Sequence, residues 1–325
     1  MKDNFNRTID YLRVSVTDRC NLRCVYCMPE KAPVYSLSEN RLTDEELVTI
    51  LRAAASLGVE RIKITGGEPL LRPKLPELIA SIYTIPGILE VTLTTNGLLL
   101  EKQLEDLVKA GIRAVNISLD ALDPKLYGAM TRGAEPEPVL LAVDKALKMG
   151  LKVKINCLPI KGMNESELAA IAGLARSKPL SVRFIELMPL GFGRGYEPVP
   201  AQEVIKRIEE AYGELSPFQG RLGNGPARYW TLPGFKGKIG FITPLSGSFC
   251  ENCNRARLTS TGFFKTCLHS LRGVDLGSPV KQGASFEELT QLMIRAVNDK
   301  PPNHAFCNPS AADGGEGLGM FQFGG

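Results

Sequence analysis

Short runs in which apolar and polar residues alternate recur through the first part of the chain, and amphipathic segments separate them. The lengths of these runs and their β-branched residues predict β-strands. They cover residues 11–17, 61–65, 90–95, 113–119, 151–157 and 181–187. Strands that alternate with helices are typical of repeated β-α units and a parallel sheet. We therefore predict the α/β class, with an incomplete TIM-like (β/α)6 barrel.

The helix after the first strand has clear end signals. Thr43 and Glu46 have the spacing of a capping box, and Gly58 is placed to end the same helix. Further helices are predicted over residues 101–110, 139–149, 201–212 and 286–297.

The composition changes after the last of the barrel helices. Glycine and proline become frequent, and short strands are predicted at residues 228–231 and 238–242. We expect residues 5–213 to form the partial barrel. Residues 214–325 are expected to form a C-terminal α+β extension that closes the barrel mouth.

Each predicted strand is apolar at one parity and polar at the other. Parallel strands that are covered on both faces are normally apolar throughout. Since successive side chains point to opposite faces, we expect the apolar set to contact the helices and the polar set to line a wide, wet lumen. An antiparallel sheet with one solvated face would give the same alternation, but the intervening helices disfavour it. The polar set is Arg13, Ser15, Thr17, Arg61, Lys63, Thr65, Thr92, Thr94, Asn96, Asn116, Ser118, Asp120, Lys152, Lys154 and Asn156.

Composition narrows the class of protein. With 44% hydrophobic and 23% charged residues, the 325-residue chain resembles an ordinary soluble globular protein. A net charge of +4 is too small to indicate a nucleic-acid or membrane partner, and we expect neither. No signal peptide or long apolar stretch is evident, so we expect a cytoplasmic protein. Eight cysteines, mostly in groups, then indicate metal ligands rather than disulfides.

Three cysteines, Cys20, Cys24 and Cys27, lie within eight residues. Thiolates in threes and fours suit iron–sulfur clusters and zinc. Zinc would require a fourth ligand, and the neighbouring residues offer none. A cubane cluster held by three cysteines leaves one iron open for a substrate, and we favour this interpretation.

A second group consists of Cys250, Cys253 and Cys267. His269 follows closely, so a Cys3His zinc site competes with a second cluster. Arg255 and Arg257 share a face if that stretch is extended, and two guanidiniums suit an anionic substrate. A solvated surface pair is the alternative.

Gly66-Gly67-Glu68-Pro69 directly follows the second strand. Two glycines at the carboxyl end of a barrel strand leave room for a ligand to approach the backbone. A simple turn before a helix would give the same sequence.

The first cysteine group, with Tyr26 before its last member, resembles the signature of radical S-adenosylmethionine (SAM) enzymes, and residues 66–69 resemble their methionine-binding segment. Residues 249–258, Cys267 and residues 13–20 together are similar to the GTP 3′,8-cyclase family of molybdenum-cofactor biosynthesis. The similarity covers nearly the whole chain. The two cysteine groups together with Arg255-Ala256-Arg257 discriminate this family from others.

This resemblance implies a radical SAM lyase that converts GTP to (8S)-3′,8-cyclo-7,8-dihydroguanosine 5′-triphosphate, the first step of molybdenum cofactor (molybdopterin) biosynthesis. It implies two [4Fe–4S] clusters and SAM as cofactors. A 5′-deoxyadenosyl radical would take the ribose 3′-hydrogen, and the second cluster would hold the purine through its open iron. Implied partners are a reductant such as flavodoxin or ferredoxin, and cyclic pyranopterin monophosphate synthase as the recipient of the product. The oligomeric state stays open, a homodimer included.

The resemblance also assigns roles to residues of this chain. The first cluster falls on Cys20, Cys24 and Cys27, and the second on Cys250, Cys253 and Cys267. SAM contacts fall on Tyr26, Gly67, Ser118 and Met188. GTP contacts fall on Arg13, Lys63, Thr94, Lys154, Arg183, Arg255 and Arg257.

Two features depart from the family pattern, Lys63 and the glycines that precede the C-terminal pair. Lys63 stands where the family usually has arginine, so the charge is kept but the bidentate fork is lost. The family's terminal Gly-Gly pair, which reaches the active site and is needed for activity, corresponds to Gly324 and Gly325. The glycines that precede this pair are unlike the usual tail.

Two other function classes compete with this interpretation. A peptide-modifying radical SAM protein with auxiliary clusters would need more cysteines in the C-terminal part. A zinc- or cluster-stabilised binding module would carry no chemistry. Iron and sulfide analysis distinguishes a zinc-stabilised module from the radical enzyme, because about eight irons per chain are expected for two cubanes and none for zinc.

Overall fold

The structure is a computed structural model that describes residues 1–31, 40–270, 272–304, 306 and 320–323. All six predicted barrel strands are present, and each pairs in parallel with the next. Two have the predicted bounds, and the other four are shorter by one or two residues. They are β1 (Tyr11–Ser15), β2 (Arg61–Thr65), β3 (Glu90–Thr95), β4 (Ala114–Ser118), β5 (Lys152–Cys157) and β6 (Ser181–Ile185).

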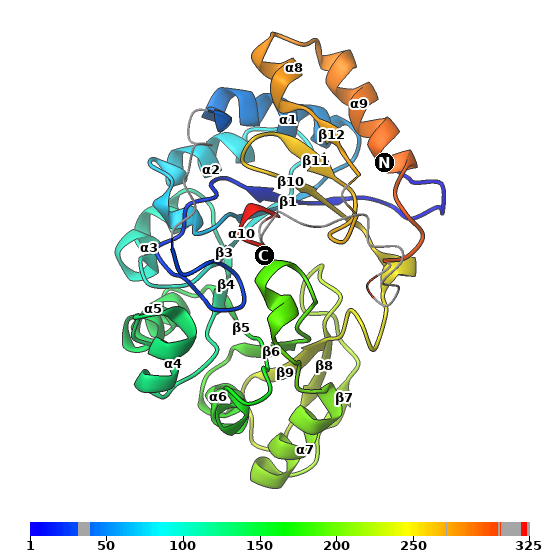
Figure 1. The fold of residues 1–325 in the computed structure, drawn as a ribbon. Coiled ribbons are helices and arrows are strands. Elements are labelled where there is room, and N and C mark those ends of the chain that lie inside the picture. Colours follow the sequence, from blue (N-terminus) through cyan, green and yellow to red (C-terminus); the bar gives the residue numbers. More distant parts are fainter. Residues whose placement is uncertain (32–39, 271, 305, 307–319, 324–325) are drawn as a thin grey trace.

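Helices connect these strands and lie on the outside of the sheet (Figure 1). They are α1 (Asp44–Ser56), α2 (Leu75–Tyr83), α3 (Leu100–Lys109), α4 (Pro124–Thr131), α5 (Glu137–Lys148), α6 (Leu168–Ser177) and α7 (Ala201–Tyr212). No helix in the described part of the chain is long and apolar enough to cross a membrane.

The C-terminal segment adds strands to both edges of the same sheet. On one side β9 (Lys238–Ile242) runs parallel to β6, and β8 (Arg228–Thr231) and β7 (Ser216–Phe218) follow it outward. On the other side β10 (Arg255–Leu258) runs parallel to β1. The described strands thus form one sheet with free edges, so the predicted incomplete barrel is confirmed.

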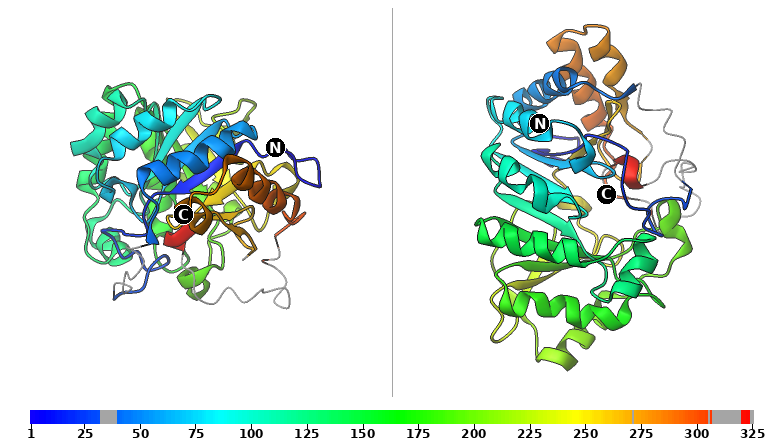
Figure 2. Two further views of the ribbon diagram at one scale, coloured as in Figure 1. Left: turned by 90° about the horizontal axis from the view of Figure 1, so that it is seen from above. Right: turned by 90° about the vertical axis from the view of Figure 1, so that its left-hand side faces the viewer.

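At the β10 edge lie β11 (Phe263–Lys265) and β12 (Val274–Asp275), followed in the chain by α8 (Gly277–Lys281) and α9 (Phe286–Asn298). The last helix that the structure describes is α10 (Met320–Phe323). In Figure 2, α10 lies on the same side of the molecule as the segment that leaves β1.

The apolar parity of the strands forms the core, as predicted. These side chains lie beneath the helices and are almost completely buried, and they belong to one cluster with the inner faces of α1 to α6. Burial of this face contributes about 25 cal/mol for each Å² of apolar surface removed from water. The strand members are Leu12, Val14, Ile62, Ile64, Val91, Leu93, Val115, Ile117, Val153 and Ile155.

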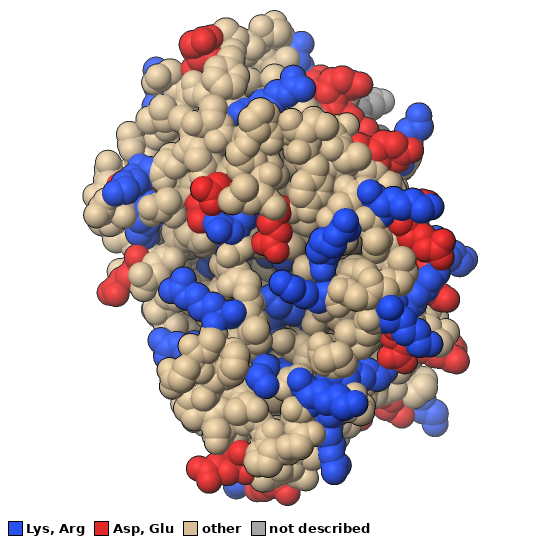
Figure 3. All heavy atoms as spheres, turned by 180° about the vertical axis from the view of Figure 1, so that it is seen from behind, with Lys and Arg blue, Asp and Glu red and all other residues tan. Residues whose placement is uncertain are grey.

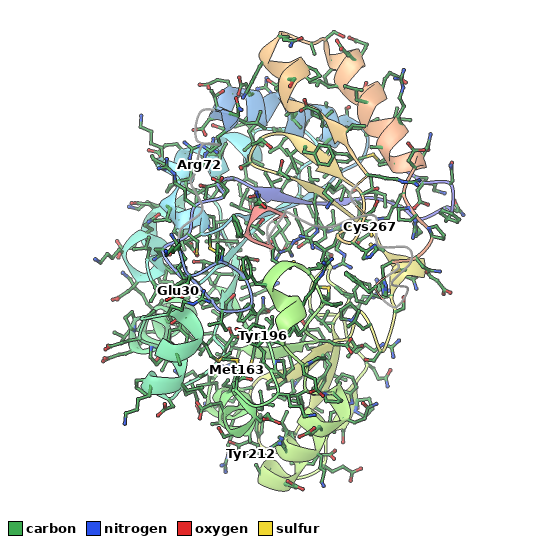
Figure 4. The ribbon with its side chains drawn as sticks, in the orientation of Figure 1. Glu30, Arg72, Met163, Tyr196, Tyr212 and Cys267 are labelled. Atoms are coloured by element: carbon green, nitrogen blue, oxygen red, sulfur yellow. The ribbon has the colours of Figure 1, made fainter. Side chains whose placement is uncertain are left out.

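Two local features fix the start of α1 beside the end of β1. The Thr43 hydroxyl accepts from the Glu46 N–H at 3.2 Å, and the Glu46 carboxylate accepts from the Thr43 N–H at 2.8 Å, so the predicted capping box is present. The buried Arg72, labelled in Figure 4, donates to the Val16 carbonyl at 2.7 Å and to the Leu42 carbonyl at 3.1 Å. The chain that leaves β1 is therefore tied to the chain that enters α1.

Thr43→Ala should lower the free energy of unfolding by about 1 kcal/mol, because the helix loses its side-chain cap. Urea denaturation of the purified protein measures this change. Thr43→Ser keeps the hydroxyl and serves as the control. Equal stability of the alanine and serine variants would show that the cap contributes nothing.

Candidate active site

The partial barrel contains a cavity of about 680 Å³. It extends from the first residues of the strands, such as Lys152 and Ser181, to residues beyond their carboxyl ends, such as Asp120. Twelve of the fifteen polar residues predicted to line a lumen do line it. The prediction is wrong for Ser15, Thr17 and Arg61. Ser15 and Thr17 are buried in the turn after β1, where the Ser15 hydroxyl donates to the Thr17 carbonyl, and Arg61 pairs with Asp10 at 2.6 Å.

The first cysteine group lines the cavity beyond the carboxyl end of β1. Cys20, Cys24 and Cys27 are each partly exposed to it. Main-chain hydrogen bonds join their loop to the end of α4, since the Val25 N–H donates to the Met130 carbonyl at 2.9 Å. Burial raises the pKa of all three thiols, that of Cys27 to about 12. A bound cation would favour the thiolate forms here.

Gly66 and Gly67 hold the same cysteine loop by close backbone packing. A Cβ on Gly67 would stand 2.3 Å from the Arg19 carbonyl oxygen, and one on Gly66 would stand 2.6 Å from the Thr17 carbonyl oxygen. The Gly67 N–H donates to the Thr17 carbonyl at 2.7 Å. The room that the missing side chains leave is thus filled by the chain leading to Cys20. Both glycines also line the cavity, where a ligand can approach.

Two carboxylates near the cysteine loop, those of Glu68 and Asp120, are buried and accept hydrogen bonds. Glu68 accepts from the Thr95 hydroxyl at 2.7 Å and from the Asn96 N–H at 2.7 Å, and burial raises its pKa to about 7. Asp120 accepts from the Tyr26 hydroxyl at 2.6 Å, and burial raises its pKa to about 6. Tyr26 is thereby fixed between the cysteine loop and the carboxyl end of β4. Ser118 and Met188 line the same end of the cavity.

Three cations stand side by side across adjacent strands. Arg257 of β10 is in register with Arg13 of β1, and Arg13 is in register with Lys63 of β2. Adjacent strands are about 4.8 Å apart. Burial lowers the pKa of each of the three groups, and nearby cations lower it further. We call Arg257, Arg13 and Lys63 the cation row; a ligand with several negative charges would relieve its repulsion.

Further cations lie on the opposite wall of the cavity. Lys154 of β5 donates to the Leu222 carbonyl, and burial lowers its pKa to about 8. Arg183 of β6 donates to the Asn156 side-chain oxygen at 2.9 Å. Thr94 accepts from Asn116 at 3.3 Å between these walls. The cavity therefore has a basic lining along much of its length.

The amino end of the barrel is closed by a loop that the sequence did not single out. Residues 221–226 line the cavity there, and Asn224 donates to Glu90 of β3 at 2.9 Å. Seen from behind, Lys and Arg side chains gather across the middle of the molecule (Figure 3). Basic side chains are thus frequent around the middle of this face.

The second cysteine group lines the same cavity as the first. Cys250 and Cys253 precede β10, and Cys267 follows β11 (Figure 4). Burial raises the pKa of Cys253, but Arg255 and Lys300 overcome this effect and lower it to about 7. Arg255 and Arg257 both belong to β10, so the stretch is extended and the two side chains point to the same face of the sheet.

Aromatic side chains complete this end of the cavity. Arg255 lies over the Phe249 ring at 4.7 Å. The His269 ring packs edge-on against Phe306 with centroids 4.6 Å apart, and His304 contacts the Pro244 carbonyl at 2.7 Å. The cavity is lined here by planar groups, whose flat faces suit a planar base. They belong to Phe249, Arg255, His269, His304 and Phe306.

The C-terminal tail also reaches the cavity. Met320 and Phe321 of α10 line it, and the Phe321 backbone N–H donates to Cys27. Gly324 and Gly325 lie outside the described residues.

The donor sets fit iron–sulfur clusters in chemistry. Each group offers three thiolates to one region of the cavity. A [4Fe–4S] cluster binds each thiolate to a different iron, so its ligands need not converge on one ion. Within the described ranges, no three His, Cys, Asp or Glu side chains are grouped to hold a single metal ion.

Comparisons with known proteins agree with these features. Residues 14–175 match the model of the Radical SAM superfamily, and residues 180–306 match that of Molybdenum Cofactor Synthesis C. A GTP 3′,8-cyclase from Pelotomaculum thermopropionicum is 46% identical over 309 residues, which cover 94% of this chain and 95% of that protein. One from Moorella thermoacetica is 44% identical over 311 residues, covering 95% and 96%.

Solved structures show the same fold at low sequence identity. Streptococcus suis SuiB superposes with a TM-score of 0.56 at 15% identity, covering 90% of this chain and 69% of that one. SuiB bound to S-adenosylmethionine gives a TM-score of 0.57 at 16% identity, covering 88% and 68%. From its relatives and its matched domains, the chain belongs to the GTP 3′,8-cyclase family of the radical SAM superfamily.

Proposed function

We propose that this protein is a GTP 3′,8-cyclase, a radical SAM lyase that forms (8S)-3′,8-cyclo-7,8-dihydroguanosine 5′-triphosphate from GTP in molybdenum cofactor biosynthesis. One observation carries the proposal. Two groups of three cysteines line a single cavity, and the cation row lies on its wall beside them. An enzyme that brings a cluster-bound cofactor to a polyanionic nucleotide requires this combination.

In this proposal Cys20, Cys24 and Cys27 hold a [4Fe–4S] cluster. A cluster held there would supply the electron for the reductive cleavage of SAM on which the radical chemistry depends. The chain's own residues hold SAM: Tyr26, Gly67, Ser118 and Met188 line the cavity at the same end. The hydrogen bond from Tyr26 to Asp120 keeps that ring fixed while the cofactor binds.

Cys250, Cys253 and Cys267 are proposed to hold a second [4Fe–4S] cluster, next to the base of GTP. The triphosphate is proposed to lie against Arg13, Lys63 and Lys154, with Arg183, Arg255 and Arg257 as further donors and Thr94 as a polar contact. Lys63, Arg183 and Arg257 are buried, which supports this arrangement, because phosphate oxygens would offset the positive charge that burial disfavours. Lys63 offers a point charge where an arginine would offer a fork.

The same proposal implies a cellular compartment, partner proteins and a domain boundary. The protein would act in the cytoplasm, receive electrons from a flavodoxin or ferredoxin, and pass its product to cyclic pyranopterin monophosphate synthase. Residues 5–213 would form the radical SAM domain and residues 214–325 the domain of the second cluster. The end of α7 at Tyr212 supports this boundary, whereas the second matched region begins earlier, at residue 180.

The proposed function is tested by anaerobic incubation of the iron-reconstituted protein with SAM, a reductant and GTP. We expect 5′-deoxyadenosine to form together with loss of GTP, at about eight irons per chain. A protein that cleaves SAM and leaves GTP unchanged would overturn the proposed substrate. One that binds zinc and no iron would overturn the chemistry.

Cys24→Ser should abolish the cleavage of SAM, because the first cluster loses a ligand. Release of 5′-deoxyadenosine under anaerobic conditions measures this step. Cys157→Ala is the matched control, since Cys157 is completely buried in the core away from the cavity. Retained cleavage in Cys24→Ser would remove this cysteine from the ligand set.

Arg257→Ala should weaken GTP binding roughly ten- to hundredfold, the range for losing a hydrogen bond to a charged group. Equilibrium dialysis with the reconstituted protein gives the Kd, and iron analysis should show unchanged clusters. Arg176→Ala, on the exposed side of α6, is the control. An unchanged Kd for Arg257→Ala would place the guanidinium outside the nucleotide site.

Deletion of Gly324 and Gly325 should leave the iron content unchanged and block the formation of the cyclised product. The nearness of α10 to Cys27 supports this expectation, because the tail enters the cavity just before these residues. Product analysis by anaerobic chromatography measures the effect. A truncated protein with full activity would show that the last two residues have no role.

A further inference from the structure

Lys300, just beyond the end of α9, is a buried lysine that contacts two separate chain segments. Only 3% of it is exposed to solvent. Its ammonium group donates to the Arg255 carbonyl at 3.0 Å and also to the Thr266 carbonyl. Arg255 lies two residues after Cys253, and Thr266 directly precedes Cys267. One side chain therefore joins the backbones that carry two of the three cysteines.

Arg7 makes the corresponding connection for the third cysteine. Its guanidinium donates to the Cys250 carbonyl at 2.9 Å, to the Pro302 carbonyl at 2.8 Å and to the Pro301 carbonyl at 2.7 Å. Asp3 fixes the other edge of the guanidinium at 2.6 Å. The segment from Lys300 to Pro302 is thus joined to all three cysteine-bearing segments by two cations.

Burial of a lysine costs free energy unless hydrogen bonds and opposite charge compensate for it. The two carbonyls compensate in part. The thiols of Cys253 and Cys267 are the neighbouring groups that can carry negative charge toward Lys300. A simple connection between α9 and the sheet would not need a buried charged group.

We propose that Lys300 is a positioning residue of the second cysteine group, with Arg7 as its counterpart. It sets the separation of the Cys253 and Cys267 backbones, and its positive charge stabilises the negative charge of three thiolates and a reduced cluster. This inference rests on the proposed second cluster. Neither Lys300 nor Arg7 lines the cavity, so both act through the cysteine segments rather than on substrate.

The test uses full-length protein in which Cys20, Cys24 and Cys27 are replaced by alanine, so that only the second group can hold a cluster. Three changes are made at Lys300 in this parent. Lys300→Arg keeps charge and donors, Lys300→Gln keeps a donor without charge, and Lys300→Met keeps neither. Lys281→Met is the control, because Lys281 donates to the Asn40 carbonyl at 2.7 Å from the surface.

After anaerobic reconstitution, iron per chain and the midpoint potential of the cluster are measured, and circular dichroism checks the fold. We expect Lys300→Met to lose at least half of the parent's iron. Lys300→Gln should keep iron with a more negative midpoint potential, because a nearby positive charge favours the reduced cluster. Lys300→Arg and Lys281→Met should match the parent.

Two results would overturn the inference in different ways. If Lys300→Met, or Lys300→Gln should the methionine variant not fold, keeps both the iron and the potential of the parent, Lys300 has no role at the cluster while the proposed function stands. If the parent itself binds no iron, the proposed second cluster fails together with this role.

Discussion

The cation row is the constraint on which the rest of the site depends. Arg257, Arg13 and Lys63 occupy one level of three neighbouring strands, and the sheet register fixes their spacing. Buried cations so close together disfavour their own charged forms, and the opposite wall adds Lys154 and more positive charge. A polyanion between the walls would favour the charged forms of these side chains. The lining of the barrel is therefore complementary to a ligand such as a nucleoside triphosphate.

The sheet topology explains how two distant cysteine groups meet in one cavity. β10 lies beside β1 in parallel, although more than 200 residues separate them in the chain. This pairing places Cys253 and the Arg255–Arg257 pair next to the strand that leads into Cys20. β11 and β12 continue outward from β10, and β9, β8 and β7 continue outward from β6, so the sheet has two free edges and the barrel is open. The C-terminal segment thus supplies both a wall of the cavity and its second metal-binding group.

Local signals in the sequence predicted much of this structure. Strand parity identified the lumen, and the Thr43–Glu46 spacing identified the start of α1, because both depend on neighbouring residues alone. Motif resemblance supplied the cysteine groups. The pairing of β10 with β1, the loop over residues 221–226 and the contacts of Lys300 depend on residues far apart in the chain, so no local pattern reveals them. The close packing of Gly67 against the Arg19 backbone is a further contact between distant residues that the sequence alone did not reveal.

In the proposed function, the basic barrel binds the triphosphate of a nucleotide between the two cysteine groups. The most direct measurement is the affinity of the reconstituted protein for GTP, GDP and guanosine by anaerobic equilibrium dialysis at one salt concentration. We expect the affinity to fall with each phosphate removed and to be weakest for guanosine by orders of magnitude. Equal affinity for all three ligands would mean that the buried cations do not hold phosphate.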